Sequence, residues 1–432
     1  MPRKKEIRDL SKYKINQVVD TFSERDYDAL NAIYDFRCLT YNQIYELVYK
    51  YNPKTGEINS ETYSKRKLKK FLEAKLVTEV MLYDKDIPPM YQLTTQGINI
   101  LRKYRNWPDN LYDEHKKVYS KGYLIESELN VKERFMAHQY NLNKFVINLE
   151  NFFRGQNFKY EDEKHLESFV GIRPDGVFTL NNIVFFLEMD MGTENDKQLK
   201  EKWDHYRKFL SSNEFILRER KIVVLFIVDG IVRINQRISL IKNTIYSNFV
   251  DCFDKDIEIF VNTPEELMDT IENRILNYDD TLKAQKEALL KNGYRIIEDS
   301  LTLEKIFTSP FSFFARKEGQ RTLNFLFEDF TYCPMSSTYK GVFFQNITRK
   351  FVESQKQDIR PVFICDNETE AFRLYSVFEL KGALFTTKQR LVGLKIHKAI
   401  FSLTEDGTMY SFEDEYFTKQ IEYGIIKIWG AI

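Results

Sequence analysis

Residues 173–190 read RPDGVFTLNNIVFFLEMD, and this stretch decides how the fold is predicted. Two strand-like runs flank Asn181-Asn182, a pair that tolerates the positive φ angles of a two-residue hairpin turn. We therefore expect one strand over residues 169–180 and a second over residues 183–190. With the two asparagines as the loop, Leu180 pairs with Ile183. Each residue before Leu180 then pairs with the residue equally far after Ile183.

This register brings acidic side chains together. Asp175 falls directly opposite Glu188, and Asp190 lies two residues beyond Glu188 on the same face, opposite Arg173. Like charges that face each other destabilise a sheet, so the acids need compensation. A Mg²⁺ or Mn²⁺ ion held by Asp175, Glu188 and Asp190 would provide it, and would activate water for attack on a phosphate. The alternative is a network of ion pairs with Arg173 and neighbouring lysines.

The elements around this hairpin define a domain over residues 130–275. A helix is expected at 134–153, a strand at 158–166, and a helix after an N-cap at Thr193. The apolar run at 221–228 is typical of a buried parallel strand. The resulting order, αβββαβ, resembles the core of restriction-endonuclease-like nucleases. His138 on the first helix is interpreted as a core histidine, with contact to the acidic cluster as the alternative.

The first part of the chain, residues 20–125, shows helical periodicity three times and then two strand patterns. This order of elements is typical of a winged helix-turn-helix. The three helices and the two strands are expected at 26–36, 40–51, 60–75, 76–83 and 90–93.

The third of these helices is strongly basic. Between residues 60 and 75 it carries six basic and two acidic side chains, a net charge of +4. In a helix-turn-helix the helix before the wing enters the major groove, where cations contact phosphates. The alternative is a lysine-rich helix that only faces solvent. The residues predicted to contact DNA are Tyr63, Lys65, Arg66, Lys67, Lys69 and Lys70.

A charged helix at 279–292 is expected to be a linker. The third part, residues 295–432, is expected to be an α/β domain, with short strands near 383–387, 399–403 and 425–429. Its strand at 361–366 and helix at 368–380 resemble the segment 223–241, which suggests a duplicated half without a matching acidic triad. No role follows from its sequence; dimerisation or docking of a partner are the default expectations.

Composition sets broad limits. The 432 residues include 64 basic and 64 acidic side chains, so a uniformly basic binder is excluded, whereas local DNA binding is not. No apolar run approaches the roughly 18 residues of a membrane span. The four cysteines form no CxxC pair, and no P-loop is present. A cytoplasmic protein that does not bind membranes is expected.

Three resemblances follow from these motifs. The segment from Ser64, SKRKLKKFLEAKLV and then YQLTTQGINIL, resembles bacterial winged-helix domains of the MarR-like kind. Pro174-Asp175 with Glu188-Met189-Asp190 resembles the PD-(D/E)xK superfamily. More closely, RPDGVF, FFLEMDMGTE and KWDHY resemble the replication-relaxation family of plasmids and mobile elements, over about residues 20–250. That resemblance implies a role in plasmid replication, relaxation or transfer.

The family pattern assigns residues to the site, with one departure. Asp175, Glu188 and Asp190 match the metal-site acids, and Glu194, Lys202 and Tyr206 match the trailing pattern. The superfamily lysine would fall at position 190, where this chain has aspartate. Lys202 on the next helix either takes over its catalytic role or only pairs with the acids.

Three functions are therefore expected from the sequence. One is a DNA-binding protein of a plasmid, phage or integrative element with a Mg²⁺-dependent endonuclease centre. The second is a non-enzymatic transcription or replication regulator that uses a degenerate nuclease fold as a scaffold. The third is a pure interaction protein that uses the nuclease fold to hold a partner. The expected partners are double-stranded DNA, a second copy in a homodimer, and replication or transfer proteins.

Overall fold

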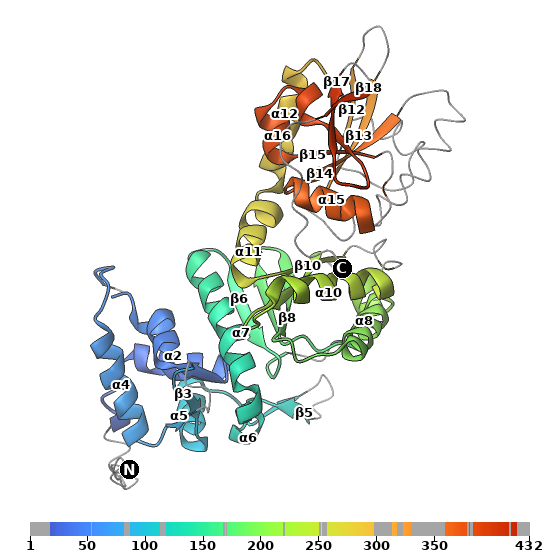
Figure 1. Cartoon of the computed structure of the whole chain (residues 1–432). Coiled ribbons are helices and arrows are strands. Elements are labelled where there is room, and N and C mark those ends of the chain that lie inside the picture. Colours follow the sequence, from blue (N-terminus) through green and yellow to red (C-terminus); the bar gives the residue numbers. More distant parts are fainter. Residues whose placement is uncertain are drawn as a thin grey trace. The chain divides into compact units, whose positions relative to one another are not determined.

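The computed structural model shows a mixed α/β protein (Figure 1). It divides into two compact units: unit 1 comprises residues 1–241 and 261–264, and unit 2 comprises residues 242–260 and 265–432. The three-domain division expected from the sequence stays a prediction. In the part of the chain that is described, no helix has the length and apolar character needed to cross a membrane. The described residues are 18–52, 54–81, 87–112, 118–166, 169, 171–218, 221–249, 252, 257–297, 313–317, 323–330, 359–377, 380, 383–413 and 416–420.

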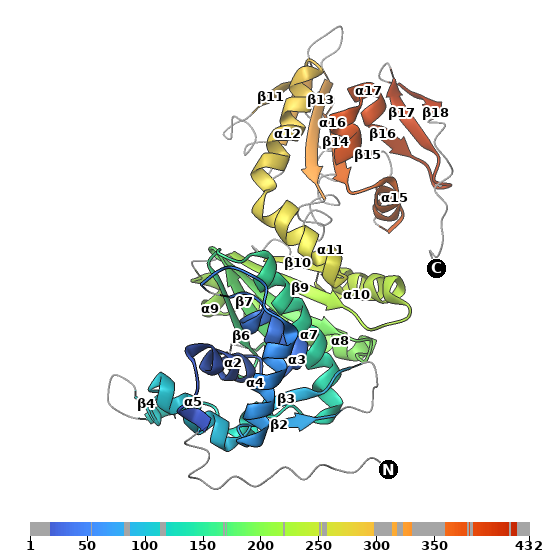
Figure 2. The same ribbon diagram turned by 90° about the vertical axis from the view of Figure 1, so that its left-hand side faces the viewer.

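The N-terminal elements of unit 1 gather at one of its ends (Figures 1 and 2). The Ser23 backbone N–H donates to Asp26 Oδ2 at 2.8 Å, which closes a capping box at the start of the first helix. Thr40 caps the next helix by accepting from the Gln43 backbone N–H. A strand not expected from the sequence, β1, pairs antiparallel with β3. The elements are α2 (Glu24–Asp35), β1 (Cys38–Thr40), α3 (Tyr41–Ile44), η1 (Tyr45–Tyr49), α4 (Glu61–Glu73), β2 (Val77–Val80), β3 (Met90–Leu93) and α5 (Thr95–Arg105).

The rest of unit 1 is built around a second sheet. Its strands lie in the order β10-β9-β8-β7-β6. The division between the units passes through the edge strand β10 (Ile257–Asn262), which pairs with β9. Phe186 packs against Phe209 and Trp203 packs against Phe226, so α8 covers one face, and Figure 1 shows α7 on the other. The elements are β4 (Asn110–Tyr112), β5 (Val118–Lys121), α6 (Glu126–Leu129), α7 (Glu133–Phe152), β6 (Phe158–Asp162), β7 (Gly176–Leu180), β8 (Ile183–Asp190), α8 (Asp196–Leu210), α9 (Asn213–Ile216), β9 (Lys221–Val228) and α10 (Ile234–Phe249), whose residues after Ile241 belong to unit 2.

The expected hairpin register is confirmed, but its first strand is shorter than predicted. Leu180 pairs with Ile183 and Gly176 with Leu187, around a turn in which Asn181 has a φ of 54°. The ladder ends at Gly176, so the strand predicted from residue 169 is wrong over its first half. Pro174 there has no backbone N–H to donate to a ladder. The expected N-cap at Thr193 is also wrong: α8 is capped by Asn195, whose side chain accepts from the Gln198 backbone N–H at 3.0 Å.

The described residues of unit 2 form one sheet of eight strands in the order β11-β12-β13-β14-β15-β16-β17-β18. Leu289 of α12 packs into a core with Phe325 and Val362, so the helix expected as a linker instead covers this sheet. A second core joins α15 to Phe363 and Phe385. The strand expected near residues 425–429 lies outside the described residues. The elements are α11 (Pro264–Asp269), η3 (Thr270–Leu276), α12 (Tyr278–Lys291), β11 (Arg295–Ile297), β12 (Phe313–Lys317), β13 (Leu323–Asp329), β14 (Ile359–Cys365), α15 (Glu368–Val377), β15 (Leu384–Thr387), α16 (Lys388–Gly393), α17 (Ile396–Ala399), β16 (Phe401–Leu403), β17 (Met409–Glu413) and β18 (Tyr416–Gln420).

Candidate functional site

Helix α4 presents a basic face to solvent. The side chains of Lys65 and Lys69 are 60% and 76% exposed, and Arg66 and Lys70 are also exposed. Lys65 and Lys69 lie 3.9 Å from Glu61 and Glu73, distances at which exposed pairs contribute little. These four cations therefore remain available to an external anion. We call Lys65, Arg66, Lys69 and Lys70 the basic face.

Two residues predicted to contact DNA do not belong to this face. Lys67 turns inward and donates to Asp26 at 2.7 Å, where the aspartate side chain is fully buried. Tyr63 is half-buried and packs edge-on against Tyr49 at 5.6 Å. The hydrogen bonds from Lys67 and Ser23 lower the pKa of Asp26, although burial alone would raise it. Lys67 and Tyr63 therefore fix α4 on the helices beneath it.

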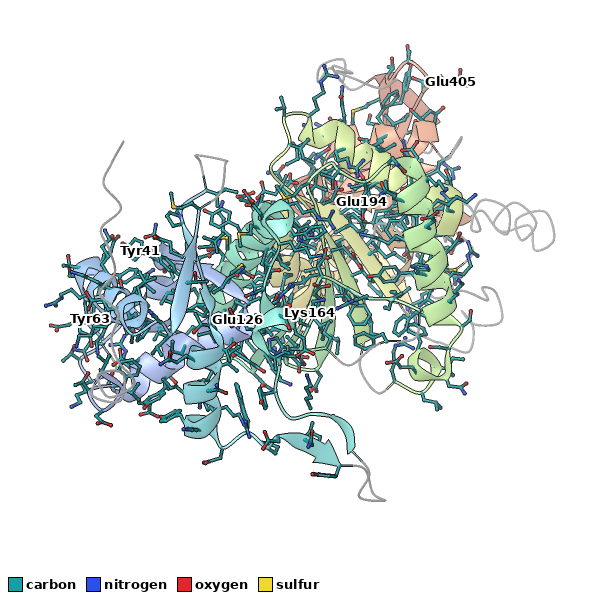
Figure 3. The ribbon with its side chains drawn as sticks, turned by 90° about the horizontal axis from the view of Figure 1, so that it is seen from below. Tyr41, Tyr63, Glu126, Lys164, Glu194 and Glu405 are labelled. Atoms are coloured by element: carbon teal, nitrogen blue, oxygen red, sulfur yellow. The ribbon has the colours of Figure 1, made fainter. Side chains whose placement is uncertain are left out.

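Figure 3 shows Tyr41 and Tyr63 at the end of unit 1 that α4 forms, away from Glu194. Tyr41 donates a hydrogen bond to Glu61 at the start of α4, and the Lys65 Nζ lies 4.7 Å from the Tyr41 ring. The basic face and the acidic residues of the sheet are thus two separate features of the unit.

Glu188 is the centre of the acidic cluster on β8. It is 3% exposed, and both of its carboxylate oxygens accept hydrogen bonds from α8. Lys202 Nζ donates to Oε2 at 2.9 Å, and Tyr206 Oη donates to Oε1 at 2.7 Å. Burial raises the pKa of Glu188, and Lys202 opposes that increase. The two donors lie one helical turn apart on α8, so the sequence expectation that they share a face agrees with the structure.

Lys202 is held among carboxylates. Besides Glu188, it contacts Glu194 Oε1 at 3.0 Å. Burial alone would lower its pKa, but the charges of Glu188, Asp175 and Glu194 raise it. Lys202 is therefore a protonated cation at neutral pH, and it neutralises Glu188. The second oxygen of Glu194 is buried and has no hydrogen-bond partner within the described residues.

Asp175 lies just before β7, beside His138 of α7. His138 Nε2 is 3.3 Å from Asp175 Oδ2 and 3.1 Å from the Met189 carbonyl oxygen. Because both neighbours are acceptors, this nitrogen carries the proton. The Met189 backbone N–H also donates to Asp175 at 2.8 Å. Burial alone would lower the pKa of His138, but its hydrogen bond to Asp175 raises it, and His138 in turn lowers the pKa of Asp175.

Asp190 has a different partner from the one predicted. Arg237 of α10 binds it in a bidentate pair, with two N–O distances of 2.7 Å, and Asp190 is 1% exposed. Arg173, the predicted partner, lies 3.4 Å from Glu163 instead. The prediction failed because the ladder ends at Gly176, so Arg173 does not continue the strand register. Arg237 lies 47 residues after Asp190, and no sequence pattern marked it.

The predicted metal set does not fit a metal in this arrangement. Mg²⁺ binds through carboxylate oxygens that also leave room for water and phosphate. Here both oxygens of Glu188 and both oxygens of Asp190 are occupied by donors of the protein itself. Within the described residues, no group of three or more histidine, cysteine or acidic side chains is placed to hold a metal ion. The charge of the cluster is compensated by Lys202, Arg237 and His138.

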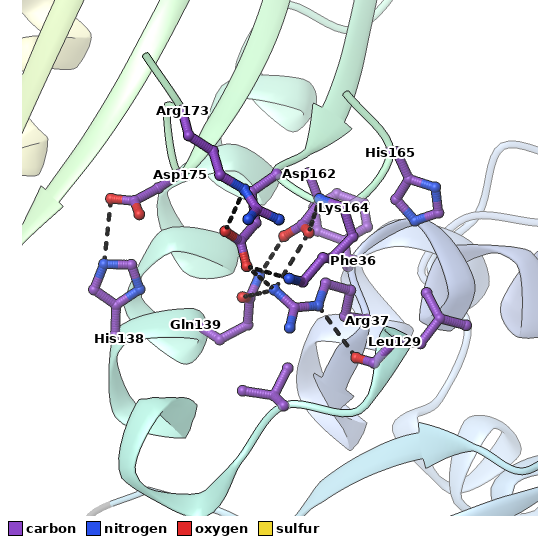
Figure 4. A network of polar contacts seen from close by, with 12 residues as sticks. Phe36, Arg37, Leu129, His138, Gln139, Asp162, Lys164, His165, Arg173 and Asp175 are labelled. Carbon is purple, nitrogen blue, oxygen red and sulfur yellow. Dashed lines mark hydrogen bonds and ion pairs between the residues drawn. The ribbon is translucent and has the colours of Figure 1, made fainter. Parts of the chain in front are cut away.

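A second polar network lies beneath the N-terminal helices (Figure 4). Arg37 is 6% exposed and has a φ of 63°. Its Nη1 donates to Glu163 at 2.8 Å and lies 3.4 Å from Asp162, while its Nε donates to the Leu129 carbonyl at 3.2 Å. Gln139 of α7 donates to Asp162 at 2.9 Å. Burial raises the pKa of Asp162 to about 6, although Arg37 opposes the increase.

This network joins the N-terminal elements to the sheet. Arg37 precedes β1, Asp162 ends β6, and Gln139 lies on α7. Asn143 of α7 adds a hydrogen bond of 2.6 Å to the Cys38 carbonyl oxygen. The sequence reasoning missed these residues because each is a single polar residue within an ordinary helix or strand pattern. They make residues 18–241 one compact body rather than two loosely linked parts.

Comparison with known proteins gives one match. Residues 30–225 match the model of the family described as replication-relaxation, as expected from the sequence. No match was found among curated proteins or among solved structures. The matched range covers α4, the hairpin with Asp175 and Glu188, and Lys202 on α8. Over residues 30–225, this chain is therefore similar to the replication-relaxation family.

Proposed function

We propose that the protein is a DNA-binding protein of a plasmid, phage or integrative element, and that it acts in replication, relaxation or transfer. In this proposal α2 to α5 and β1 to β3 form a winged helix, and α4 is its recognition helix. The observation that carries it is the basic face of α4. The family matched by residues 30–225 supports the link to replication or relaxation.

The geometry of the basic face suits a DNA backbone. Lys65, Arg66, Lys69 and Lys70 lie on adjacent turns, and five residues span about 7.5 Å along an α-helix. The major groove admits a helix, and its rims present phosphates to lysine and arginine side chains. Lys67 holds the helix from below through Asp26, so the exposed cations project from a fixed base.

For the central sheet, the compensated charges favour the non-enzymatic alternative. Glu188, Asp190 and Asp175 are each bonded to a side chain of the same chain, and Glu188 and Asp190 are buried. In this reading the nuclease-like fold is a scaffold that carries the DNA-binding end of unit 1. The Arg37 network supports the reading, because it fixes the N-terminal elements on the sheet.

A metal-dependent cleaving centre is the second candidate. It is favoured by the convergence of two acids and one lysine, the residue types of the PD-(D/E)xK pattern. Lys202 donates to Glu188, and the charges of Glu188 and Asp175 raise the pKa of Lys202. For this function Glu188 would have to exchange its bond to Lys202 for a metal. The scaffold proposal requires no such exchange.

A gel-shift series tests the DNA-binding proposal. The variant K65A/R66A/K69A is compared with K197A/K200A/K208A, which removes the same charge from exposed positions of α8. We expect only the α4 variant to lose affinity for duplex DNA. Equal affinities of both variants and the wild-type protein would contradict the proposal.

Nicking of supercoiled plasmid separates the scaffold from the cleaving centre. The wild-type protein, Asp175→Ala and Glu188→Ala are incubated with Mg²⁺ or with Mn²⁺. The scaffold proposal predicts no nicking above background by any of the three. Metal-dependent nicking that both substitutions abolish would establish the second candidate.

A further inference from the structure

The two large sheets repeat one succession of elements. In unit 1, α7 leads into β6, β7 and β8, which pair antiparallel in turn, and β9 then lies parallel to β8 and leads into α10. In unit 2, α12 leads into β11, β12 and β13 with the same antiparallel pairing, and β14 then lies parallel to β13 and leads into α15. The segment between β13 and β14 includes residues 331–358, which lie outside the described residues.

The third and fourth strands also share sequence between the units. Phe185-Phe186-Leu187-Glu188 of β8 corresponds to Phe325-Leu326-Phe327-Glu328 of β13, with the first and last residues identical. Phe226-Ile227-Val228-Asp229, at the end of β9, corresponds to Phe363-Ile364-Cys365-Asp366 at the end of β14, with three of the four residues identical.

The strand register is an independent test of these two matches, because both were made from sequence identity without reference to which strands pair. In unit 1, Glu188 is the register partner of Phe226. In unit 2, Glu328 is the register partner of Phe363. The same glutamate–phenylalanine pair therefore bridges the third and fourth strands of both sheets. Two unrelated sheets would have no reason to bring the matched residues into the same pair.

The faces of the sheets agree as well. Phe226 packs against Trp203 of α8, on the face to which Glu188 points. Phe363 packs into the core formed with α15, while Asp329, the residue after Glu328, accepts a hydrogen bond from Gln285 of α12 on the opposite face. Since side chains alternate along a strand, Glu328 points toward the α15 side. Like Glu188, it is buried, at 2% exposure.

We infer that unit 2 contains a second, diverged copy of the fold in unit 1, and that Glu328 is the counterpart of Glu188. The copy keeps the glutamate but not its acidic neighbours: the positions of Asp175 and Asp190 are taken by Ser312, which lies outside the described residues, and Phe330. The C-terminal region is therefore a tandem scaffold of the same class, and among its described residues Phe330 stands where the acidic cluster of unit 1 has Asp190. This inference does not rest on DNA binding.

Full-length protein with labelled methyl groups and phenylalanine rings tests the topology. The copy requires two corresponding parallel pairs, Leu187–Leu225 between β8 and β9 and Phe327–Val362 between β13 and β14. We expect a nuclear Overhauser cross-peak between the side chains of each pair. Presence of the Leu187–Leu225 peak without the Phe327–Val362 peak would overturn the inference.

Hydrogen exchange measured by mass spectrometry tests the role of Glu328. We expect Glu328→Gln to raise exchange in β13 and β14 about tenfold, and Glu188→Gln to raise it by a similar factor in β8 and β9. Glu287→Gln, on an exposed position of α12, is the matched control and leaves exchange unchanged. If Glu328→Gln behaves as Glu287→Gln does, Glu328 is not the counterpart of Glu188. The cross-peaks of the wild-type protein decide the topology even where a variant does not fold.

Discussion

Replacing Lys202 by methionine keeps the length of the side chain and removes the cation that neutralises Glu188. The Glu188 side chain is 4% exposed and that of Lys202 is 21% exposed, so the variant leaves a buried carboxylate without its ion partner. Breaking such a pair costs about 3–5 kcal/mol. Because Tyr206 still donates to Glu188 at 2.7 Å, we expect the lower value, about 3 kcal/mol.

Thermal unfolding followed by calorimetry is the assay. For a body of this size, each kcal/mol shifts the melting temperature by about 2–4 °C, so Lys202→Met should lower it by about 6–12 °C. Lys197→Met is the matched control, since its side chain is 85% exposed and its pair with Glu201 spans 3.8 Å. It should change the stability by less than about 0.5 kcal/mol.

The double variant E188Q/K202M isolates the pair. Glutamine carries no charge, so we expect the double variant to be more stable than the sum of the two single losses by about 2 kcal/mol. Two results would show that Lys202 does not compensate a buried charge. One is that the losses in free energy of unfolding of the two single variants add strictly in the double variant, and the other is a loss below about 1 kcal/mol for Lys202→Met. A rise in the wild-type melting temperature on addition of Mg²⁺ would also oppose this compensation, because a ligand that binds the folded state stabilises it.

The remaining predictions concern the N-terminal end of unit 1. Lys67→Met should lower the melting temperature and leave the salt dependence of DNA binding unchanged. Lys69→Ala should leave the melting temperature unchanged and reduce the salt dependence. Burial raises the pKa of Asp35 to about 7, above its value in the unfolded chain. The folded protein therefore favours the protonated carboxyl, and it loses stability as the pH rises through 7 and this group ionises. Asp35→Asn should stabilise the protein more at pH 8 than at pH 5 in urea titrations. Arg37→Met, which leaves Asp162 buried without its cation, should cost about 3–5 kcal/mol and lower the stability of the N-terminal helices and the sheet together in hydrogen exchange.

The sequence predicted local structure well where a short-range rule applied. The turn at Asn181-Asn182 set the register of the hairpin, and helical spacing placed Lys202 and Tyr206 on one face of α8. The basic face was also predictable, because charged side chains on an amphipathic helix are exposed. Lys67 was the exception, since its direction depends on Asp26, which lies 41 residues earlier.

Long-range pairing was not predictable from the sequence. The partner of Asp190 comes from α10, and the network around Arg37 joins four separate segments of the chain. These pairs depend on how the helices and strands pack against each other. The spacing of apolar residues along the sequence does not specify that packing. The sequence alone indicates the proposed duplication only through the weak resemblance of residues 361–380 to residues 223–241. The strand register adds that Glu188 and Glu328 each pair with a phenylalanine, Phe226 and Phe363.

The salt dependence of DNA affinity tests the proposed function most directly. Each phosphate contact contributes about 0.9 to the slope of log affinity against log salt concentration. Replacing Lys65, Arg66, Lys69 and Lys70 by alanine should therefore lower the slope for a random 30-base-pair duplex by about 3–4, measured by fluorescence anisotropy with the full-length protein. An unchanged slope would show that α4 does not face DNA and would contradict the proposed DNA-binding function.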